Sequence, residues 1–232
     1  MNDRGGTAAN PLDASASGSE GRPENPAGTP KALHSDCGAQ SKWGASREEW
    51  LDFSDTLGLT RDLLPVVSNP SAVRSPVSTL KGLGKTPSRY NAHRQVVGFS
   101  RWTEYIAKAA DVESWMKEPD YGICVQTRRL RGIDIDIDDP AKALEVAVIV
   151  LRFLAMSAAH LNVRFRSNSG RLLIPIVAKG DVKKSTINTP HGTIEFLADG
   201  QQFIAAGTHP SGERYQWTKL EELLDHRHSL LQ

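Results

Sequence analysis

The sequence predicts an α+β fold: a two-layer domain with a mixed β-sheet core and flanking helices. Apolar and polar residues alternate from Ile133 to Asp138, which is the period of a strand with two different faces. From Pro140 to Ala158, apolar residues instead recur at helical spacing. Strand candidates outnumber helices in the second half of the chain, whereas the two alternate in the first half. This mixture favours helices packed on a sheet.

The N-terminal segment has a different composition from the rest. Residues 1–45 are dominated by Gly, Ala, Ser, Pro, Asn and Asp and contain almost no large apolar side chains. They cannot bury enough apolar surface to offset the entropy lost on ordering, so we expect a disordered tail. A folded domain is expected over residues 46–218, and an amphipathic helix within residues 219–232 is expected to close it.

Local signals place the elements between these limits. Ser46 suits the N-cap of a helix over residues 47–57, and the prolines in residues 61–91 predict a largely irregular chain. A helix is expected from Ser100 to about Ala109, where Trp102, Tyr105 and Ile106 have helical spacing. The remaining expected elements are a short helix around 112–116, a hairpin of residues 121–127 and the alternating strand with its turn at 128–130, a mostly buried helix over 140–158, strands at 163–166, 171–177, 192–197 and 201–206, and a helix over 219–231.

Composition narrows the classes of protein. With 232 residues and 39% hydrophobic content, the chain has enough apolar material for one large domain or two small ones. Cys37 and Cys124 are too few for a disulfide framework or a cysteine-based zinc site, so we expect a reducing compartment. No apolar run reaches membrane-spanning length, and the first residues lack the apolar core of a secretory signal. A cytoplasmic protein without a membrane partner is therefore expected.

The net charge of +1 hides a local imbalance. Residues 71–131 carry eleven Lys and Arg against five Asp and Glu. Such a basic segment suits the phosphates of nucleic acids or nucleotides, but it is also compatible with an ordinary solvated surface.

The alternating strand is the most informative feature. Asp134, Asp136 and Asp138 fall on one of its faces, where like charges repel, and a divalent cation would relieve that repulsion. We therefore predict Asp134 and Asp136 as metal ligands. Asp138 and Asp139 are better explained as the start of the next helix, with Asp139 as N-cap before Pro140.

Two motif-like patterns are rejected. Asp134, Asp136, Asp138 and Glu145 match ligand positions of an EF-hand loop, but Asp139 stands where that loop needs glycine. Residues 81–87, Lys-Gly-Leu-Gly-Lys-Thr-Pro, resemble a phosphate-binding P-loop, but the first glycine is missing and a proline follows the Lys-Thr pair. Lys85, and Arg89 just after this segment, either contact phosphates from a loop or are solvated charges.

Three blocks together resemble the archaeo-eukaryotic primase superfamily, in its bacteriophage and plasmid primase-polymerase (Prim-Pol) branch. The first is Gly132–Asp136, similar to that family's hydrophobic-DxD motif. The second is Arg164–Arg171, at the place of its nucleotide-binding strand. The third and most specific begins with Thr193–Leu197 and continues from Asp199 to Gly212 and from Tyr215 to Trp217. Residues 63–68 and 84–91 also look like the N-terminal part of such phage proteins.

The resemblance implies a DNA primase and DNA polymerase that works by metal-dependent, template-directed nucleotidyl transfer in phage or plasmid replication, in the cytoplasm of a bacterial host. Its implied catalytic and metal-binding residues are Asp134, Asp136 and Glu195, holding two Mg²⁺ or Mn²⁺ ions. Implied partners are a single-stranded DNA template with its primer, nucleoside triphosphates and a helicase, on the same natural chain or separate. The resemblance also implies that residues 46–218 form the catalytic domain and that the helix within residues 219–232 is a candidate linker to a further domain. The implied nucleotide-binding residues are Arg171, Ser169, His209, Arg166, Gln202 and Lys85.

One departure from the family pattern concerns the second block. Many relatives carry a histidine there that contacts the triphosphate, whereas Leu172, Leu173 and Ile174 follow Arg171 here. Arg171 is expected to substitute, because a guanidinium binds phosphate in a bidentate manner.

Two alternative functions remain open at this point. A non-catalytic replication initiator or single-stranded-DNA-binding module would use the basic segment without synthesis. A nucleotide-sugar glycosyltransferase would also place an aspartate pair on a metal-bound diphosphate.

Overall fold

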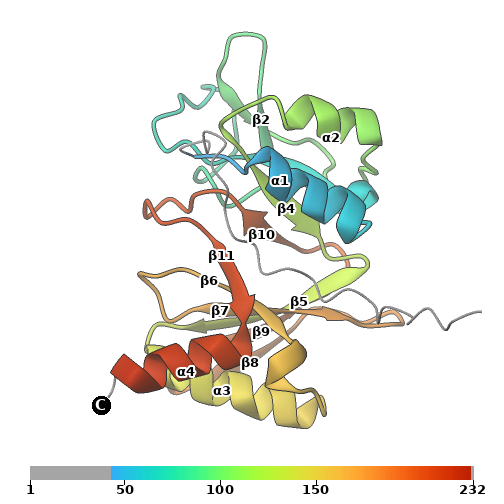
Figure 1. Ribbon diagram of the computed structural model, residues 1–232. Helices are drawn as coiled ribbons and strands as arrows, with labels where there is room; N and C mark the ends of the chain where they lie inside the picture. The colour runs from blue at the N-terminus through green and yellow to red at the C-terminus, as the bar shows by residue number, and fades with distance from the viewer. Residues whose placement is uncertain (1–42, 231–232) are drawn as a thin grey trace, which may run out of the picture. The chain divides into compact units, whose positions relative to one another are not determined.

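The computed structural model describes residues 43–230, and Figure 1 shows their arrangement. Of the tail predicted for residues 1–45, all but the last three residues lie outside this range. Gly44 N donates a hydrogen bond to Pro119 O at 2.9 Å, and Ala45 N donates to Tyr121 O at 2.8 Å. The ordered chain thus includes residues that precede the expected start at Ser46. None of the described helices is long and apolar enough to cross a membrane.

A three-stranded antiparallel sheet has the strand order β1-β4-β10, with β1 at Leu63–Val67, β4 at Tyr121–Gln126 and β10 at Gln202–Ala206. Every residue of β1 is buried, which corrects the prediction of irregular chain over 61–91. The prediction failed because Pro65 lies inside the strand. An edge strand tolerates proline, since the missing N–H faces away from the partner strand.

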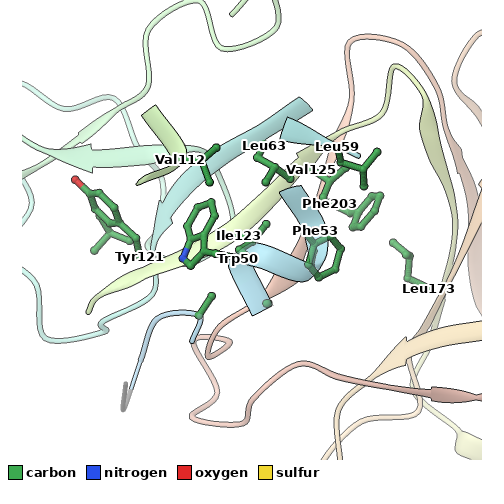
Figure 2. Close-up of a cluster of buried hydrophobic side chains, with 14 of the residues drawn as sticks. Trp50, Phe53, Leu59, Leu63, Val112, Tyr121, Ile123, Val125, Leu173 and Phe203 are labelled. Atoms are coloured by element: carbon green, nitrogen blue, oxygen red, sulfur yellow. The ribbon is translucent and has the colours of Figure 1, made fainter. Parts of the chain in front are cut away.

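The three-stranded sheet packs against helix α1, Arg47–Leu51, whose predicted N-cap is confirmed: Ser46 Oγ accepts from Glu49 N at 3.2 Å. The helix widens into a π-helical segment over Asp52–Thr56, so the predicted extent to residue 57 is close to the observed one. Figure 2 shows Trp50 and Phe53 of this segment buried with side chains of β1, β4 and β10. Leu173, from the second sheet, joins the same cluster.

The second sheet has six antiparallel strands in the order β11-β6-β7-β5-β9-β8. The aspartate strand, β5, lies between β7 and β9. Its neighbour in sequence, β4, belongs to the other sheet, so the predicted hairpin of β4 and β5 is wrong. The bounds are β5 Leu130–Ile137, β6 Asn162–Phe165, β7 Leu172–Val177, β8 Ser185–Thr189, β9 Gly192–Leu197 and β11 Gln216–Lys219. Strands β8 and β11 were not predicted.

Two helices cover one face of the six-stranded sheet, α3 at Pro140–Phe153 and α4 at Leu220–Leu230 (Figure 1). Asp139 is the predicted N-cap of α3, and its carboxylate accepts from Ala141 N at 2.8 Å. The helix ends before the predicted Ala158, and Phe153 is 88% exposed although the helix was expected to be mostly buried. The first turn of α4 packs into the core through Leu220 and Leu223. The α+β class, with two layers and flanking helices, is confirmed.

The predicted helix at residues 100–109 is also wrong. The chain makes single turns there, in which Glu104 N donates to Arg101 O, and the positive φ of 47° at Arg101 is incompatible with a continuous helix. The spacing of aromatic residues instead serves a small core where Trp102 and Tyr105 pack around Phe99. The short helix expected nearby is α2, Ala109–Trp115. A small hairpin of β2, Ser88–Tyr90, and β3, Val96–Gly98, was not predicted.

Candidate active site

Strand β5 separates packing from charge by its alternation. Ile133, Ile135 and Ile137 enter the core beneath α3 and α4. Asp134 lies on the opposite face, directly across from Leu173 of β7 on one side and Glu195 of β9 on the other. Because residues paired across antiparallel strands share a face, the predicted carboxylates Asp134 and Glu195 lie on the same side of the sheet.

A pocket of about 130 Å³ lies over Asp134 and Asp136. Its walls come from β5, from β6 and the loop that follows it, and from the segment after β10. They bring together residues that are far apart in sequence. The lining residues are Asp134, Asp136, Arg164, Phe165, Arg166, Arg171, His209 and Tyr215.

Arg171 is an ion-pair partner of the aspartates. Its Nε lies 2.7 Å from Asp136 Oδ1 and donates a hydrogen bond of 2.9 Å to Asp138 Oδ1. That hydrogen bond lowers the pKa of Asp138 below its ordinary value and raises the pKa of Arg171. The contact to Asp136 is a charge contact without hydrogen-bond alignment, since Asp136 Oδ1 is buried and accepts no hydrogen bond.

Asp134 has a longer ion-pair contact than Asp136. Burial raises its pKa, the nearby Arg164 guanidinium lowers it, and the carboxylates of Asp136 and Glu195 raise it again. Arg164 Nη2 is 3.8 Å from Asp134 Oδ1, which is too long for a hydrogen bond. The Arg164 guanidinium also lies over the Tyr215 ring at 4.6 Å and donates to Ile204 O. These contacts fix the arginine above the aspartate without neutralising it completely.

The opposite wall of the pocket is basic. Arg166 Nη1 lies 2.8 Å from His209 Nδ1 and donates to Ser211 Oγ at 3.1 Å, while Arg166 Nη2 donates to Ser169 Oγ at 3.2 Å. Burial and the neighbouring cations lower the pKa of His209 to about 4. His209 is therefore neutral at pH 7. Since Ser211 N donates to His209 Nδ1 at 3.0 Å, the ring proton belongs on Nε2.

Glu195 is on the predicted face but outside the pocket lining. Its Oε1 forms an ion pair with Lys184 Nζ at 2.9 Å and accepts from Thr186 Oγ1 at 3.3 Å. Each of the three predicted carboxylates thus has its own basic neighbour: Arg164 beside Asp134, Arg171 beside Asp136 and Lys184 beside Glu195.

The fit of this site to a divalent cation can be judged from these contacts. Within residues 43–230, no group of three or more His, Cys, Asp or Glu side chains lies close enough to hold an ion. The buried Asp136 oxygen without a hydrogen bond and the raised pKa of Asp134 nevertheless indicate carboxylates that a cation would stabilise. By their chemistry the two aspartates fit a divalent cation, whereas Glu195 is paired with Lys184 outside the pocket lining.

Three predicted nucleotide-binding residues, Ser169, Gln202 and Lys85, are not among the lining residues of the pocket, although Ser169 accepts a hydrogen bond from Arg166. Gln202 Nε2 donates to Lys85 O at 2.9 Å, and its Oε1 accepts from Cys124 Sγ at 2.9 Å, so both ends of this side chain bind protein. Lys85 is exposed, yet its charge contributes to the low pKa of His209. Lys85 is therefore near the basic wall, whereas Gln202 positions the loop that carries it.

Arg164 and Tyr215 line the pocket but were not predicted as site residues. Arg164 and Arg166 stand two apart next to a strand and so point to the same side, which is a signal that the sequence does contain. Tyr215 gives no such signal. It reaches the pocket because β11 pairs with β6 at the edge of the sheet, a long-range pairing that local patterns do not reveal.

Comparison with known proteins adds one positive finding. The family model described as "Bifunctional DNA primase/polymerase, N-terminal" matches residues 62–226. This range contains both sheets and every residue of the pocket. No curated protein matches the sequence significantly.

Proposed function

The chain belongs to the bifunctional DNA primase/polymerase family, and we propose that it performs metal-dependent, template-directed nucleotidyl transfer. The observation that carries this proposal is the pocket itself, in which two aspartates face Arg164, Arg166 and Arg171. Carboxylates can hold divalent cations, while guanidinium groups bind phosphate, so this combination suits a nucleoside triphosphate. The substrates are therefore DNA and nucleoside triphosphates, and the setting we propose is phage or plasmid replication.

We assign Asp134, Asp136 and Glu195 as the ligands of two Mg²⁺ or Mn²⁺ ions. When bound, such ions activate the primer 3′-hydroxyl group and stabilise the charge that develops on the leaving pyrophosphate. Arg171 now lies against one oxygen of Asp136 and Lys184 against one oxygen of Glu195, so a cation that takes these oxygens displaces both basic groups. Both ion pairs are partly exposed, so their separation costs little.

The basic wall supplies the triphosphate contacts. Arg171, once released from Asp136 and Asp138, can turn its guanidinium toward phosphate oxygens in the same pocket. Arg166 is held in place by Ser169 Oγ and His209 Nδ1, so it presents its charge with little loss of side-chain entropy. His209 is neutral and can donate one hydrogen bond from Nε2.

The decisive experiment measures primer extension and unprimed synthesis on single-stranded DNA, with Mg²⁺ and with Mn²⁺. We expect products with either ion and none with a chelator. An Asp134→Asn/Asp136→Asn variant serves as the control, because it removes the charges but keeps the side-chain shapes. Strand binding without synthesis would instead indicate a non-catalytic replication module, and cleavage of a nucleotide sugar would indicate a glycosyltransferase.

A further inference from the structure

A second pocket, of about 330 Å³, lies beside the candidate active site and takes no part in the chemistry described above. Residues of the β1–β2 connection form most of its wall, and they include part of the rejected P-loop-like segment. Pro210 closes it from the other side. The lining residues are Ser68, Pro70, Ala72, Arg74, Lys81, Gly82, Leu83 and Pro210.

The two pockets share an edge. Pro210 lines the second pocket and follows His209, which lines the first. Gly84 holds the loop against this edge: its φ is +70°, and a Cβ atom placed on it would lie 3.1 Å from Pro210 Cδ. A larger residue would push the loop away from the proline, so the close approach depends on glycine here. The linings of the two pockets thus meet at residues 209–210.

The charge of the second pocket identifies the chemistry of its ligand. Arg74 and Lys81 are its two charged lining residues, and none of the lining residues is acidic. Arg74 Nη1 donates to Leu80 O at 2.9 Å, which orients the guanidinium. The rest of the wall includes the apolar side chains of Pro70, Ala72 and Leu83. A chain that alternates phosphates with less polar sugars fits such a surface better than a free ion does.

We propose that this pocket binds the phosphodiester backbone of single-stranded DNA on its way to the active site, with Arg74 and Lys81 as the phosphate contacts. The proposal rests on the proposed function for the identity of the strand, and it goes beyond it by assigning a binding site separate from the aspartates. The proposal also gives the loop at residues 81–84 a role. This loop is not a P-loop, because the chain continues from it into strand β2 and not into a helix.

The test is the binding of a fluorescently labelled single-stranded oligonucleotide, measured by anisotropy in a chelating buffer at several salt concentrations. We expect Arg74→Gln/Lys81→Gln to weaken binding about tenfold at low salt. The double variant should also reduce the slope of log affinity against log salt by about 1.4, which corresponds to two phosphate contacts. Lys142→Gln/Arg152→Gln, on α3 behind the six-stranded sheet, changes the net charge equally and should leave both quantities unchanged.

A second variant protects the test from an effect on folding. Lys81 is exposed, so Lys81→Glu should fold normally and still weaken strand binding. The proposal is overturned if both Lys81 variants bind the strand like the wild type, or if they change only the KM for nucleotides, which would assign the pocket to a free nucleotide. The binding assay contains no free metal ion and does not depend on synthesis. If the wild type failed to synthesise DNA in the primer-extension assay, that would contradict the proposed function without affecting the binding result.

Discussion

The two faces of strand β5 use the same backbone for different purposes. On one face, Ile135 and Ile137 are fully buried and serve only packing. On the other, Asp134 and Asp136 remain partly exposed beside arginines. Since neighbouring residues of one strand point to opposite faces, stability and chemistry are separable here at a spacing of a single residue. Substitutions on the aspartate face should therefore reduce synthesis without reducing stability, and substitutions on the isoleucine face should do the reverse.

The largest expected effect is on the aspartate face. Asp134→Asn/Asp136→Asn should reduce synthesis by at least roughly a thousandfold, because the proposed metal ligands lose their charge. Stability should stay the same or rise, since burial raises the pKa of Asp134 and so disfavours its charged form in the folded state. Primer extension and urea unfolding of the same preparation check both parts. Retained synthesis would contradict the assignment, and so would loss of the fold.

The converse substitution is on the isoleucine face. Ile135→Ala should lower the free energy of unfolding by about 2–5 kcal/mol, because it leaves a cavity beneath α3. Synthesis per folded molecule should remain near the wild-type level at low temperature. Ile135→Val is the milder control, with an expected loss of about 0.5–1.5 kcal/mol. If Ile135→Val abolished synthesis without unfolding the protein, the two faces would not be independent.

The features that could be predicted from the sequence are those that depend on neighbouring residues. The alternation of β5 and the N-caps at Ser46 and Asp139 depend on neighbouring residues, and the structure confirms them. The choice of strand partners is not local. β4 and β5 are joined by a short turn, yet β4 pairs with β1 and β10, because each strand is buried in the middle of a different sheet.

The residues of the candidate site also divide into those that one strand predicts and those that depend on more distant parts of the chain. Asp134 and Asp136 could be predicted from one strand, whereas the metal assignment of Glu195 and the nucleotide assignments of Arg166 and His209 depended on family resemblance. The structure brings Arg166 and His209 to the aspartate pocket. Lys184 was missed because strand β8, whose pairing with β9 brings it beside Glu195, was not predicted, and the position of Arg164 beside Asp134 depends on how β6 is placed at a distance in sequence.

Arg171 has two proposed roles, to bind the triphosphate and to pair with Asp136, and one substitution tests both with a smaller expected effect. Arg171→Ala should weaken apparent nucleotide affinity by roughly ten- to a hundredfold, because a charge-assisted phosphate contact is lost. The same variant should bind Mn²⁺ alone about two- to fivefold more tightly, since the competing ion pair with Asp136 is absent. Electron paramagnetic resonance of free Mn²⁺ measures the second quantity without turnover.

Arg166→Ala is the matched control for Arg171→Ala. It removes a positive charge from the same pocket, but Arg166 makes no ion pair with Asp136. It should therefore weaken nucleotide binding with a smaller gain in Mn²⁺ affinity. Equal gains in both variants would show that only the general charge of the pocket matters and that Arg171 does not compete directly for the carboxylate.

The smallest expected effect is the contribution of His209 to the dependence of stability on pH. His209 has a pKa of about 4 in the folded protein, below its ordinary value of 6.5, because burial and the Arg166 charge disfavour the imidazolium. As the pH falls below 6.5, the unfolded chain takes up a proton that the folded chain does not, so stability is lost until the pH reaches about 4. The raised pKa of Asp134 acts in the opposite direction at acidic pH, so the wild-type curve alone is not diagnostic.

The difference between variants isolates His209. We expect His209→Asn to lose less stability than the wild type between pH 6.5 and pH 4, as measured by urea unfolding at several pH values. His160→Gln, at an exposed site, is the control and should follow the wild-type curve. Parallel curves for the wild type and His209→Asn would mean that His209 takes up its proton equally in both states. The pKa of His209 would then be close to its ordinary value of 6.5, and a minority of molecules would carry a charged imidazole at pH 7.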